Sequence, residues 1–417
     1  MNKTSHIWNI LDKELEREKN TVELIASENY PSEEVLAAVG THFALKYTEG
    51  YPNKEDVEKF QKEHPDYVHT GNVGRYYGGC SFFGELELYC RYMWQKVFNV
   101  VGKYHCNVQP HSGSSANMEV YASVLEPGDT ILSMSLANGS HLSHGSPVNF
   151  SGKLYNMVFY NTDSQGFIDY TDIYNKIIEY KPKMVVVGAS AYSRTIHYDQ
   201  IKELIDRAAE KIGYTPYMFV DMAHVAGLIA GGVHPSPFGY ADFISTTTQK
   251  SLRGNRGGIV FCKPEYAKKV DSAVFPYAQG GSLMNEIAGK AVTAEEALRP
   301  EFKEYAKQVV LNAKAMCDEF IKMGYDVVTG GTDNHMFLID FSKTHPNLTG
   351  KKVQDELDKY GITLNKNSVP NEKRSPMQTS GVRIGTPAMT TLGYKEQAFI
   401  AVAHRIDTII NDFIDEN

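Results

Sequence analysis

The length, composition and charge of the chain exclude several classes of protein. Its 417 residues allow about two to three domains and a large buried core, which excludes a miniprotein held together by disulfides. Hydrophobic residues make up 42% of the chain and charged residues 22%, so it is neither disordered nor collagen-like. The formal net charge of -8 provides no broad positive field, so neither nucleic acid nor a membrane is an expected partner.

The cysteines indicate the redox environment of the protein. All five are widely spaced, and none belongs to a Cys-x-x-Cys pair. This pattern suggests neither a disulfide framework nor a metal site, so we expect free thiols in a reducing compartment. Segment 1–20 does not resemble a signal peptide, and no apolar run approaches the roughly 18–20 residues of a membrane helix. We therefore expect a cytoplasmic protein.

Hydrophobic periodicity predicts an α/β fold for most of the chain. Apolar residues between positions 7 and 15 recur at helical spacing, which predicts an amphipathic first helix able to dock on its own chain or on another. Further helices are predicted after Pro110 and over Asp199–Ile212. Buried strands that alternate with helices indicate a largely parallel sheet. The expected strands are Ile131–Met134, Asn156–Tyr160, Met184–Gly188, Tyr217–Val220, Phe243–Thr248 and Ile259–Cys262.

The pattern changes near residue 300 and predicts a smaller α+β domain at the C-terminus. A long helix is predicted over Glu301–Met323 and a final helix from about Lys395 to Ile414. Strand-like runs between them are Asp326–Val328, Met336–Asp340 and Val382–Gly385. We therefore expect an N-terminal arm (1–75), a large α/β domain (76–299) and a small C-terminal domain (300–417).

One charged segment of the arm, residues 55–74, differs from its surroundings. It contains seven charged residues and two histidines, which is typical of a solvated surface loop. Val57 and Phe60 are three positions apart, a spacing that permits one short amphipathic turn ending at Pro65. We expect a short helix followed by an extended return, packed over a substrate entrance or a subunit boundary.

Three features of the sequence together fit a pyridoxal-phosphate site. Asp221 ends a predicted strand, and such strand ends face the ligand crevice of an open α/β sheet. Lys250 follows another strand end, where an amine can be desolvated and kept nucleophilic. The run Ser112-Gly113-Ser114 begins a predicted helix, whose backbone N–H groups favour a phosphate. Each feature alone has a simpler explanation, namely a cap, a surface lysine or an ordinary helix start.

Long segments in the same order along the chain resemble serine hydroxymethyltransferase. The likeness extends from about Thr21 to Thr391. The segments are VELIASENYPS (Val22–Ser32), KYTEGYP (Lys46–Pro52), RYYGGC (Arg75–Cys80), NVQPHSGSSAN (Asn107–Asn117), HLSHGSPVNFSGKLYN (His141–Asn156), FVDMAHVAGLIAGGVHP (Phe219–Pro235), GGTDNHMFLIDF (Gly330–Phe341) and NKNSVPNE (Asn365–Glu372).

The resemblance implies a fold, an assembly and a reaction. The implied fold is that of a fold-type I pyridoxal-phosphate enzyme, with a mostly parallel seven-stranded sheet in the large domain and a smaller α+β C-terminal domain. The implied assembly is a homodimer with active sites shared between subunits, paired into tetramers in some members. The implied reaction is the reversible conversion of L-serine and tetrahydrofolate to glycine and 5,10-methylenetetrahydrofolate, through an aldimine of pyridoxal 5'-phosphate on Lys250.

The resemblance also implies roles for individual residues. Catalytic roles would belong to Lys250, Glu49, Asp221, His141 and Tyr47. Asp221 would pair with the pyridine nitrogen, and His141 would stack on the ring. Further implied cofactor contacts are Ser112, Gly113 and Ser114 with the phosphate, His224 and Ser190 with the phenolic oxygen, and Tyr47 and Gly281 from the other subunit. The implied contacts with the amino-acid substrate are Arg383, Ser27, Tyr77 and His224. The implied contacts with folate are Glu49, Tyr76, Leu136, Leu142 and Asn367.

The sequence departs from the family pattern around the implied folate pocket. Gln249 replaces the histidine that usually precedes the lysine, and Asn255 replaces a proline. Asn138-Gly139-Ser140 stands where His-Gly-Gly is usual, and 55–74 is an insertion between Glu49 and Tyr76. These changes keep open a folate-independent aldolase or transaldolase acting on a β-hydroxy or α-substituted amino acid. A further alternative is a non-catalytic binding or regulatory relative.

Overall fold

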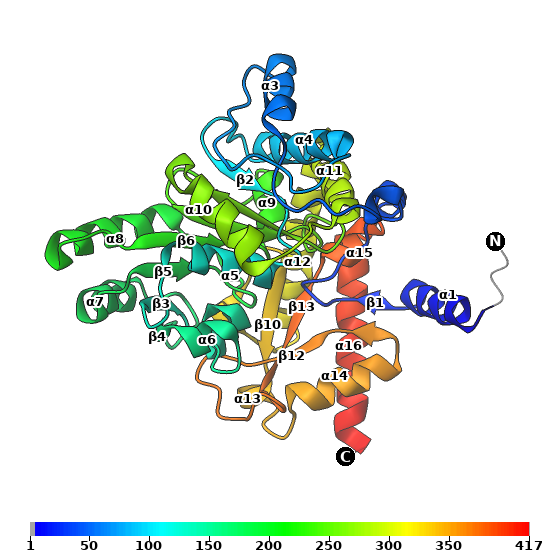
Figure 1. Cartoon of the computed structure of the whole chain (residues 1–417). Coiled ribbons are helices and arrows are strands. Elements are labelled where there is room, and N and C mark those ends of the chain that lie inside the picture. The colour runs from blue at the N-terminus through cyan, green and yellow to red at the C-terminus, as the bar shows by residue number, and fades with distance from the viewer. Residues whose placement is uncertain (1–4, 417) are drawn as a thin grey trace.

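A seven-stranded sheet forms the centre of the larger part of the molecule in the computed structural model, which describes residues 5–416 (Figure 1). Its strand order is β2-β8-β7-β6-β5-β3-β4, and only β8 runs antiparallel to its neighbours. This confirms the expected mostly parallel sheet. The strands are β2 (His105–Asn107), β3 (Thr130–Met134), β4 (Asn156–Tyr160), β5 (Met184–Val187), β6 (Tyr217–Asp221), β7 (Phe243–Thr247) and β8 (Gly258–Cys262).

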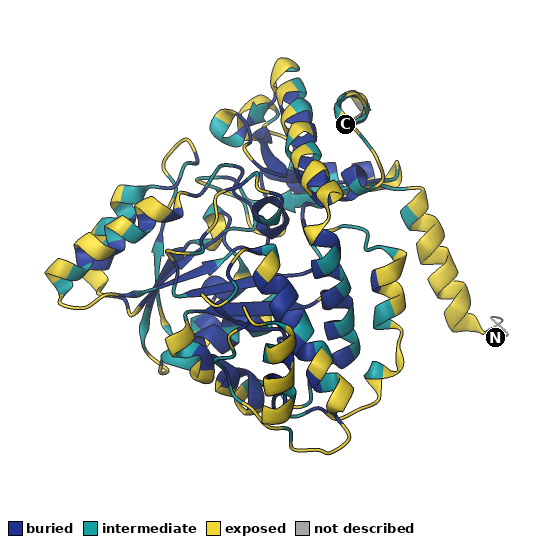
Figure 2. Cartoon of the chain, turned by 90° about the horizontal axis from the view of Figure 1, so that it is seen from above, coloured by how far each residue is buried: buried dark blue, intermediate teal, exposed yellow. Residues whose placement is uncertain are grey.

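Both faces of this sheet are buried, as the dark blue strands of Figure 2 show. Successive residues of β5 alternate between two cores: Val185 and Val187 pack with one, and Met184 and Val186 with the other. A run of valines fits a strand covered on both sides. The covering helices are α4 (Ser81–Val97), α5 (Gly113–Val124), α6 (Phe150–Leu154), α7 (Tyr170–Tyr180), α8 (Tyr198–Ile212), α9 (Ala226–Ala230), α10 (Ala267–Ser272) and α11 (Met284–Leu298).

The C-terminal part contains a four-stranded antiparallel sheet in the order β12-β13-β10-β9. The long helix α12 (Pro300–Lys322) joins the two parts, because Val309 packs in the core of the large sheet and Met316 in the C-terminal core. The remaining elements are β9 (Asp326–Val327), β10 (Met336–Asp340), α13 (Phe341–Thr344), α14 (Gly350–Lys359), β11 (Ile362–Thr363), β12 (Asn365–Asn367), β13 (Gly381–Gly385), α15 (Pro387–Thr391) and α16 (Glu396–Glu416).

The N-terminal segment reaches the C-terminal part. Strand β1 (Val22–Glu23) pairs with β11, and Leu24 is buried in the C-terminal core. Helix α2 (Glu33–Val39) then packs on α11. Helix α1 (His6–Lys19) projects from the body of the molecule, and none of its residues is buried (Figures 1 and 2). No helix in the described part of the chain is both long and apolar enough to cross a membrane.

The 55–74 segment packs on α4 at the end of the molecule away from α16 (Figure 1). It contains helix α3 (Lys54–Glu63), which is longer than the single turn predicted because Asn53 and Asp56 form a capping box at its start. Val57, Phe60 and Tyr67 are buried, and the rings of Phe60 and Tyr67 meet edge to face with centroids 5.2 Å apart. The segment is therefore packed against the fold and is not merely a solvated loop.

Buried charges secure the point where this segment leaves and rejoins the fold. The side chain of Glu87 on α4 is 0% exposed and accepts hydrogen bonds from Arg75 and Arg91, both at 2.5 Å. Burial by itself would raise the pKa of Glu87, but the two arginines lower it below its usual value. Arg75 also donates to the carbonyls of Thr48 and Gly50, each at 2.7 Å. The ionised Glu87 thus holds the chain on both sides of Glu49.

Replacement of Glu87 by alanine tests this cluster. Glu87→Ala leaves Arg91 buried without its carboxylate, and we expect the free energy of unfolding to fall by about 3–5 kcal/mol. The control is Glu304→Ala, which removes an exposed ion pair with Lys307 and should cost about 1 kcal/mol or less. Urea unfolding followed by circular dichroism measures both variants. Equal unfolding midpoints for the two would show that Glu87 contributes no more than a surface charge.

Candidate active site

A cavity of about 360 Å³ lies at the carboxyl ends of β5, β6 and β7. Ser190 follows β5, Asp221 ends β6, and Lys250 follows β7; all three line the cavity. The N-terminus of α5 forms another wall, and Arg383 on β13 closes the cavity from the C-terminal part. Open α/β sheets bind their ligands at this edge. The cavity therefore lies between the two parts of the chain.

Three donors hold the carboxylate of Asp221. Asn117 Nδ2 and His144 Nε2 lie 2.9 and 3.1 Å from its Oδ2 atom, and the Ala223 N–H donates to Oδ1 at 3.0 Å. Burial would raise the pKa of Asp221, but the hydrogen bond from His144 and the positive charge of Lys250 lower it below the usual value. Asp221 is consequently an ionised carboxylate with acceptor capacity left on Oδ1.

The imidazole of His141 is neutral and oriented. The backbone N–H of Ser143 donates to its Nδ1 atom at 3.2 Å, so the ring proton is on Nε2. Burial lowers the pKa of His141 to about 4, although Asp221 opposes the shift. A neutral, fixed imidazole on the cavity wall is suited to lie against a flat aromatic ring.

The amine of Lys250 is more easily deprotonated than that of an ordinary lysine. Burial lowers its pKa to about 8; Asp221 opposes this shift and Arg383 adds to it. The backbone is held in place because the Lys250 carbonyl accepts a hydrogen bond from Asn29 Nδ2 at 3.0 Å. An amine with a pKa near 8 has a substantial neutral, nucleophilic fraction at neutral to mildly alkaline pH.

The start of α5 forms a seat for an anion. Ser112 caps this helix of 12 residues, and its hydroxyl accepts a hydrogen bond from the Ser115 N–H at 3.2 Å. A Cβ atom at Gly113 would lie 2.6 Å from Thr247 Cγ2, so no larger residue fits there without a shift. Thr247 Oγ1 and Gln249 Oε1 are buried at the cavity without a partner in the described part of the chain. Of these two orphaned atoms only the Thr247 hydroxyl can donate, and this hydroxyl and the helix N-terminus fit a bound phosphate group. The Gln249 carbonyl oxygen can only accept, so it does not contribute to the anion seat.

Arg383 is held so that part of its guanidinium remains available. Its Nε atom donates to Asn365 Oδ1 at 3.0 Å, and Nη1 donates to the Ser190 carbonyl at 2.5 Å. Burial lowers the pKa of Arg383 to about 10, so it stays charged at neutral pH. The remaining N–H groups suit a carboxylate, and Ser27 lines the same cavity.

The cavity brings together many of the residues expected from the sequence and leaves others outside. Those that line it are Ser27, Ser112, Gly113, Ser114, His141, Ser190, Asp221, His224, Lys250 and Arg383. Those outside the set of lining residues are Tyr47, Glu49, Tyr76, Tyr77, Gly281, Leu136, Leu142 and Asn367.

Four of the residues outside the cavity gather on one surface, here named the Tyr47 patch: Tyr47, Glu49, Tyr77 and Gly281. The Tyr47 ring is 64% exposed and lies 5.6 Å from the Tyr77 ring, measured between centroids. A Cβ atom at Gly281 would lie 3.4 Å from Tyr47 Cδ1 and 4.0 Å from Glu49 Cγ. None of these four residues lines the cavity of its own chain.

Sequence reasoning did not identify Asn117, His144 or Thr247 as site residues. Asn117 lies in the first turns of α5, and Ser245 Oγ donates to its Oδ1 atom at 2.6 Å, which turns its NH₂ group toward Asp221. His144 lies three positions after His141 on a short helical turn. Both are inside segments that resemble the family, but only the tertiary contact with Asp221 shows what they do.

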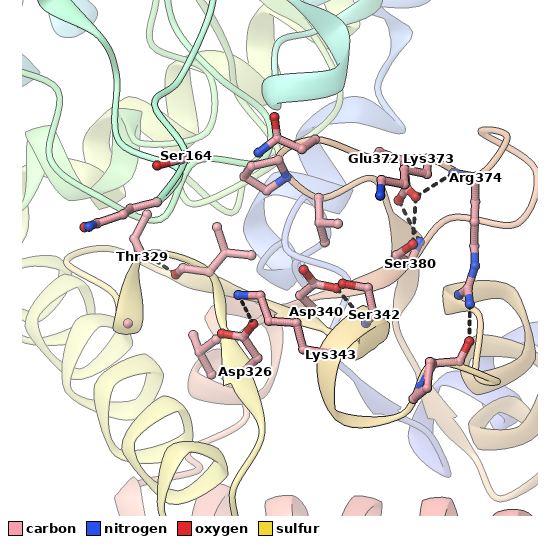
Figure 3. Close-up of a pocket in the computed structure, with 18 residues that line it drawn as sticks. Ser164, Asp326, Thr329, Asp340, Ser342, Lys343, Glu372, Lys373, Arg374 and Ser380 are labelled. Atoms are coloured by element: carbon pink, nitrogen blue, oxygen red, sulfur yellow. Dashed lines mark hydrogen bonds and ion pairs between the residues drawn. The ribbon is translucent and has the colours of Figure 1, made fainter.

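A second and larger cavity, of about 780 Å³, borders the C-terminal sheet (Figure 3). Most of its charged side chains already have partners, such as Lys343 with Asp326 at 2.7 Å and Glu372 with the Ser380 hydroxyl at 2.7 Å. Arg374 donates to backbone carbonyls. Because these groups satisfy one another, we assign the chemistry to the smaller cavity.

A comparison with protein families agrees with this arrangement. The family model described as Serine hydroxymethyltransferase matches residues 1–59 and 64–406, so residues 60–63 are the only part of the expected 55–74 insertion that lies outside the match. The match covers nearly the whole chain and includes every residue that lines the smaller cavity. The chain therefore belongs to the serine hydroxymethyltransferase family, fold-type I enzymes that use pyridoxal 5'-phosphate, with tetrahydrofolate as co-substrate, to interconvert serine and glycine.

Proposed function

We propose that the 360 Å³ cavity is where this chain converts L-serine and tetrahydrofolate to glycine and 5,10-methylenetetrahydrofolate. One observation carries the proposal: the Lys250 amine, the Asp221 carboxylate and the phosphate seat of α5 line the same cavity. These groups match the aldehyde, the ring nitrogen and the phosphate of pyridoxal phosphate. When bound, this cofactor supplies the electron sink that lets a bond to the α-carbon of an amino acid break.

Within this cavity, each side chain has a role that follows from its contacts. Lys250 supplies the amine that attaches the cofactor, and Asp221 holds the proton on the ring nitrogen. Asn117 and His144 fix the Asp221 carboxylate through Oδ2, which would leave Oδ1 to accept from the ring nitrogen. Arg383 binds the carboxylate of the amino acid from the opposite wall. The substrate is thus held between the two parts of the chain.

We further propose that the protein is a homodimer with two shared active sites. Tyr47 and Tyr77 are exposed and Glu49 and Gly281 are half-buried. None of the four lines the cavity of its own chain, so the Tyr47 patch is available to complete the cavity of a second copy. There Glu49 would move the proton of the substrate β-hydroxyl group. Helix α1 exposes Ile7, Ile10 and Leu15 and supplies a further apolar face for the same contact.

The folate pocket would lie at this shared boundary. Tyr76 and Glu49 lie side by side, because the Tyr76 N–H donates to the Glu49 carbonyl at 3.0 Å. Leu136 and Leu142 are exposed, as expected for a rim that a partner or a pterin covers. Asn367 on β12 completes the proposed set. In the described residues, no observation favours a folate-independent aldolase or a non-catalytic relative.

Two further features of the chain are part of the proposal. The five cysteines are all buried and unpaired, which supports a reducing, cytoplasmic location. The proposed division is an arm over 1–75, a large domain over 76–299 and a small domain over 300–417; the first half of α12, up to Val309, packs in the core of the large part and its second half in the C-terminal core.

The first prediction concerns the attachment of the cofactor. Pyridoxal phosphate, trapped with borohydride, should label only the peptide that contains Lys250. The rate of labelling should rise with pH, with a midpoint near the lowered Lys250 pKa of about 8. Lys290 is the matched control, because burial also lowers its pKa to about 8. Its ammonium donates to three backbone carbonyls, so the Lys290 peptide should remain unlabelled. Peptide mapping by mass spectrometry gives the result. Label retained by Lys250→Ala, or a midpoint near 10.5, would refute the assignment.

The second prediction tests the shared sites. Chains carrying Lys250→Ala and chains carrying Glu49→Gln should each be nearly inactive. When an equal mixture of the two is unfolded and refolded, half of the dimers should contain one chain of each kind, and each of these mixed dimers has one intact site. The mixture should therefore recover about a quarter of the wild-type activity. A mixture of Lys250→Ala with Asp221→Ala is the control and should stay inactive, since both residues line one cavity. No recovery in the first mixture would place Glu49 and Lys250 in the same chain's site.

The third prediction concerns the 55–74 segment. The ends of the segment are close together, because the Arg75 N–H donates to Asn53 Oδ1 at 3.1 Å, so a chain that joins Lys54 directly to Arg75 is feasible. Excision should leave attachment of pyridoxal phosphate intact but raise the KM for tetrahydrofolate or weaken the dimer. Steady-state kinetics and analytical ultracentrifugation measure the two effects. Unchanged values for both would make the segment a neutral addition to the surface.

A further inference from the structure

A second histidine, His335, lies behind His224. Its side chain is fully buried at 0% exposure and does not line the cavity, whereas His224 does. The His335 Nε2 atom is 3.2 Å from His224 Nδ1, and the two rings stack at 30° with centroids 5.5 Å apart. In the described residues, the only side chain that hydrogen-bonds to the His224 ring is thus an imidazole from the C-terminal part of the chain.

The backbone holds His335 firmly in this position. The Thr386 N–H donates to the His335 carbonyl at 3.0 Å. On the other side, Asn334 Oδ1 accepts from the Met336 N–H at 3.1 Å, and Asn334 Nδ2 donates to the Tyr192 carbonyl at 2.9 Å. His335 therefore immediately precedes β10 on a segment that is tied to both parts of the chain.

Only one of the two nitrogen atoms that face each other, His224 Nδ1 or His335 Nε2, carries a proton. Burial lowers the pKa of His224 and of His335 below the usual value for histidine, and the positive charges of Lys250 and Arg383 act in the same direction. His141 faces His224, and His234 faces His335, and neither adds a negative charge. Both imidazoles are neutral at pH 7, so the 3.2 Å contact contains either a proton on His335 Nε2 or one on His224 Nδ1.

The unpartnered atom of His335 decides between these two arrangements. Its Nδ1 atom is buried and has no hydrogen-bond partner in the part of the chain that the structure describes. A proton on His224 Nδ1 would force the His335 proton onto this atom and bury an N–H group without an acceptor, which is rare in folded proteins. A proton on His335 Nε2 leaves only a lone pair unpaired. The geometry therefore favours His335 as the donor.

We propose that His335 is a positioning residue that fixes His224 as a hydrogen-bond donor toward the cavity. Since His224 Nδ1 accepts from His335, the proton of His224 is on Nε2, the other polar atom of the ring. A donor at that place suits a negatively charged oxygen, such as the phenolate oxygen of the cofactor. This role rests on the proposed function of the cavity, but the protonation pattern itself belongs to the protein without any ligand.

The test is to determine the tautomer of His224 in the apoprotein. Nitrogen-15 NMR of the histidine side chains, with His224→Gln used to assign the signals, should show His224 protonated on Nε2 only. His335→Gln should preserve this state, because its amide can donate from the same position. His335→Phe keeps a ring of similar size but removes the donor. We expect it to abolish the single tautomer and to weaken binding of pyridoxal phosphate about tenfold.

The control is His69→Phe, which replaces a half-buried histidine of the 55–74 segment that lies outside the cavity lining. It should leave the His224 signals and cofactor binding unchanged. A wild-type His224 protonated on Nδ1 would overturn the proposal, and so would a His335→Phe variant that keeps the Nε2 tautomer. The wild-type spectrum shows which nitrogen of His224 carries the proton, so it tests the proposal even if a variant fails to fold. Because it needs no cofactor, it also separates this proposal from the proposed function of the cavity.

Discussion

The active site depends on keeping a buried carboxylate ionised at the end of β6. Removing Asp221 from water favours its neutral form, so the fold must supply donors and positive charge to oppose this effect. It does so with Asn117 from α5, His144 from a short turn and the amine of Lys250. The same carboxylate limits how far the pKa of Lys250 falls. The acid and the amine therefore depend on each other, and the parallel sheet brings them together by ending β6 and β7 at one edge.

The C-terminal part of the chain supplies the other half of this environment. Arg383 reaches the cavity from β13, and His335 contacts His224 from the segment before β10. Both strands belong to one antiparallel sheet, so their positions relative to each other are set by backbone hydrogen bonds. Helix α12 packs on this sheet and connects it to the rest of the molecule, and strand β1 pairs with β11 in a separate two-stranded sheet of the C-terminal part. The groups that recognise a carboxylate and orient His224 thus depend on how the two parts of the chain meet.

A separate arrangement of buried charge positions the residues that lie outside the cavity. Glu87 holds Arg75, and Arg75 binds the carbonyls on either side of Glu49. The 55–74 segment begins and ends at this place, with its own small core of Val57, Phe60 and Tyr67 packed on α4. The Tyr47 patch is therefore supported by buried contacts, which suits the role that we propose for it in the site of a second copy.

The sequence by itself determined six of the seven strands of the large sheet, because runs such as the valines of β5 are continuously apolar and can be recognised without knowing which strands lie beside them. It also identified Asp221, Lys250 and the start of α5, since strand ends and helix starts have local signals. It did not identify β2, which has no apolar run, or the contacts of Asn117, His144 and His335 with their partners. Those side chains come from segments far apart in the chain, and their function depends on distances of about 3 Å. Only the tertiary structure decides such distances.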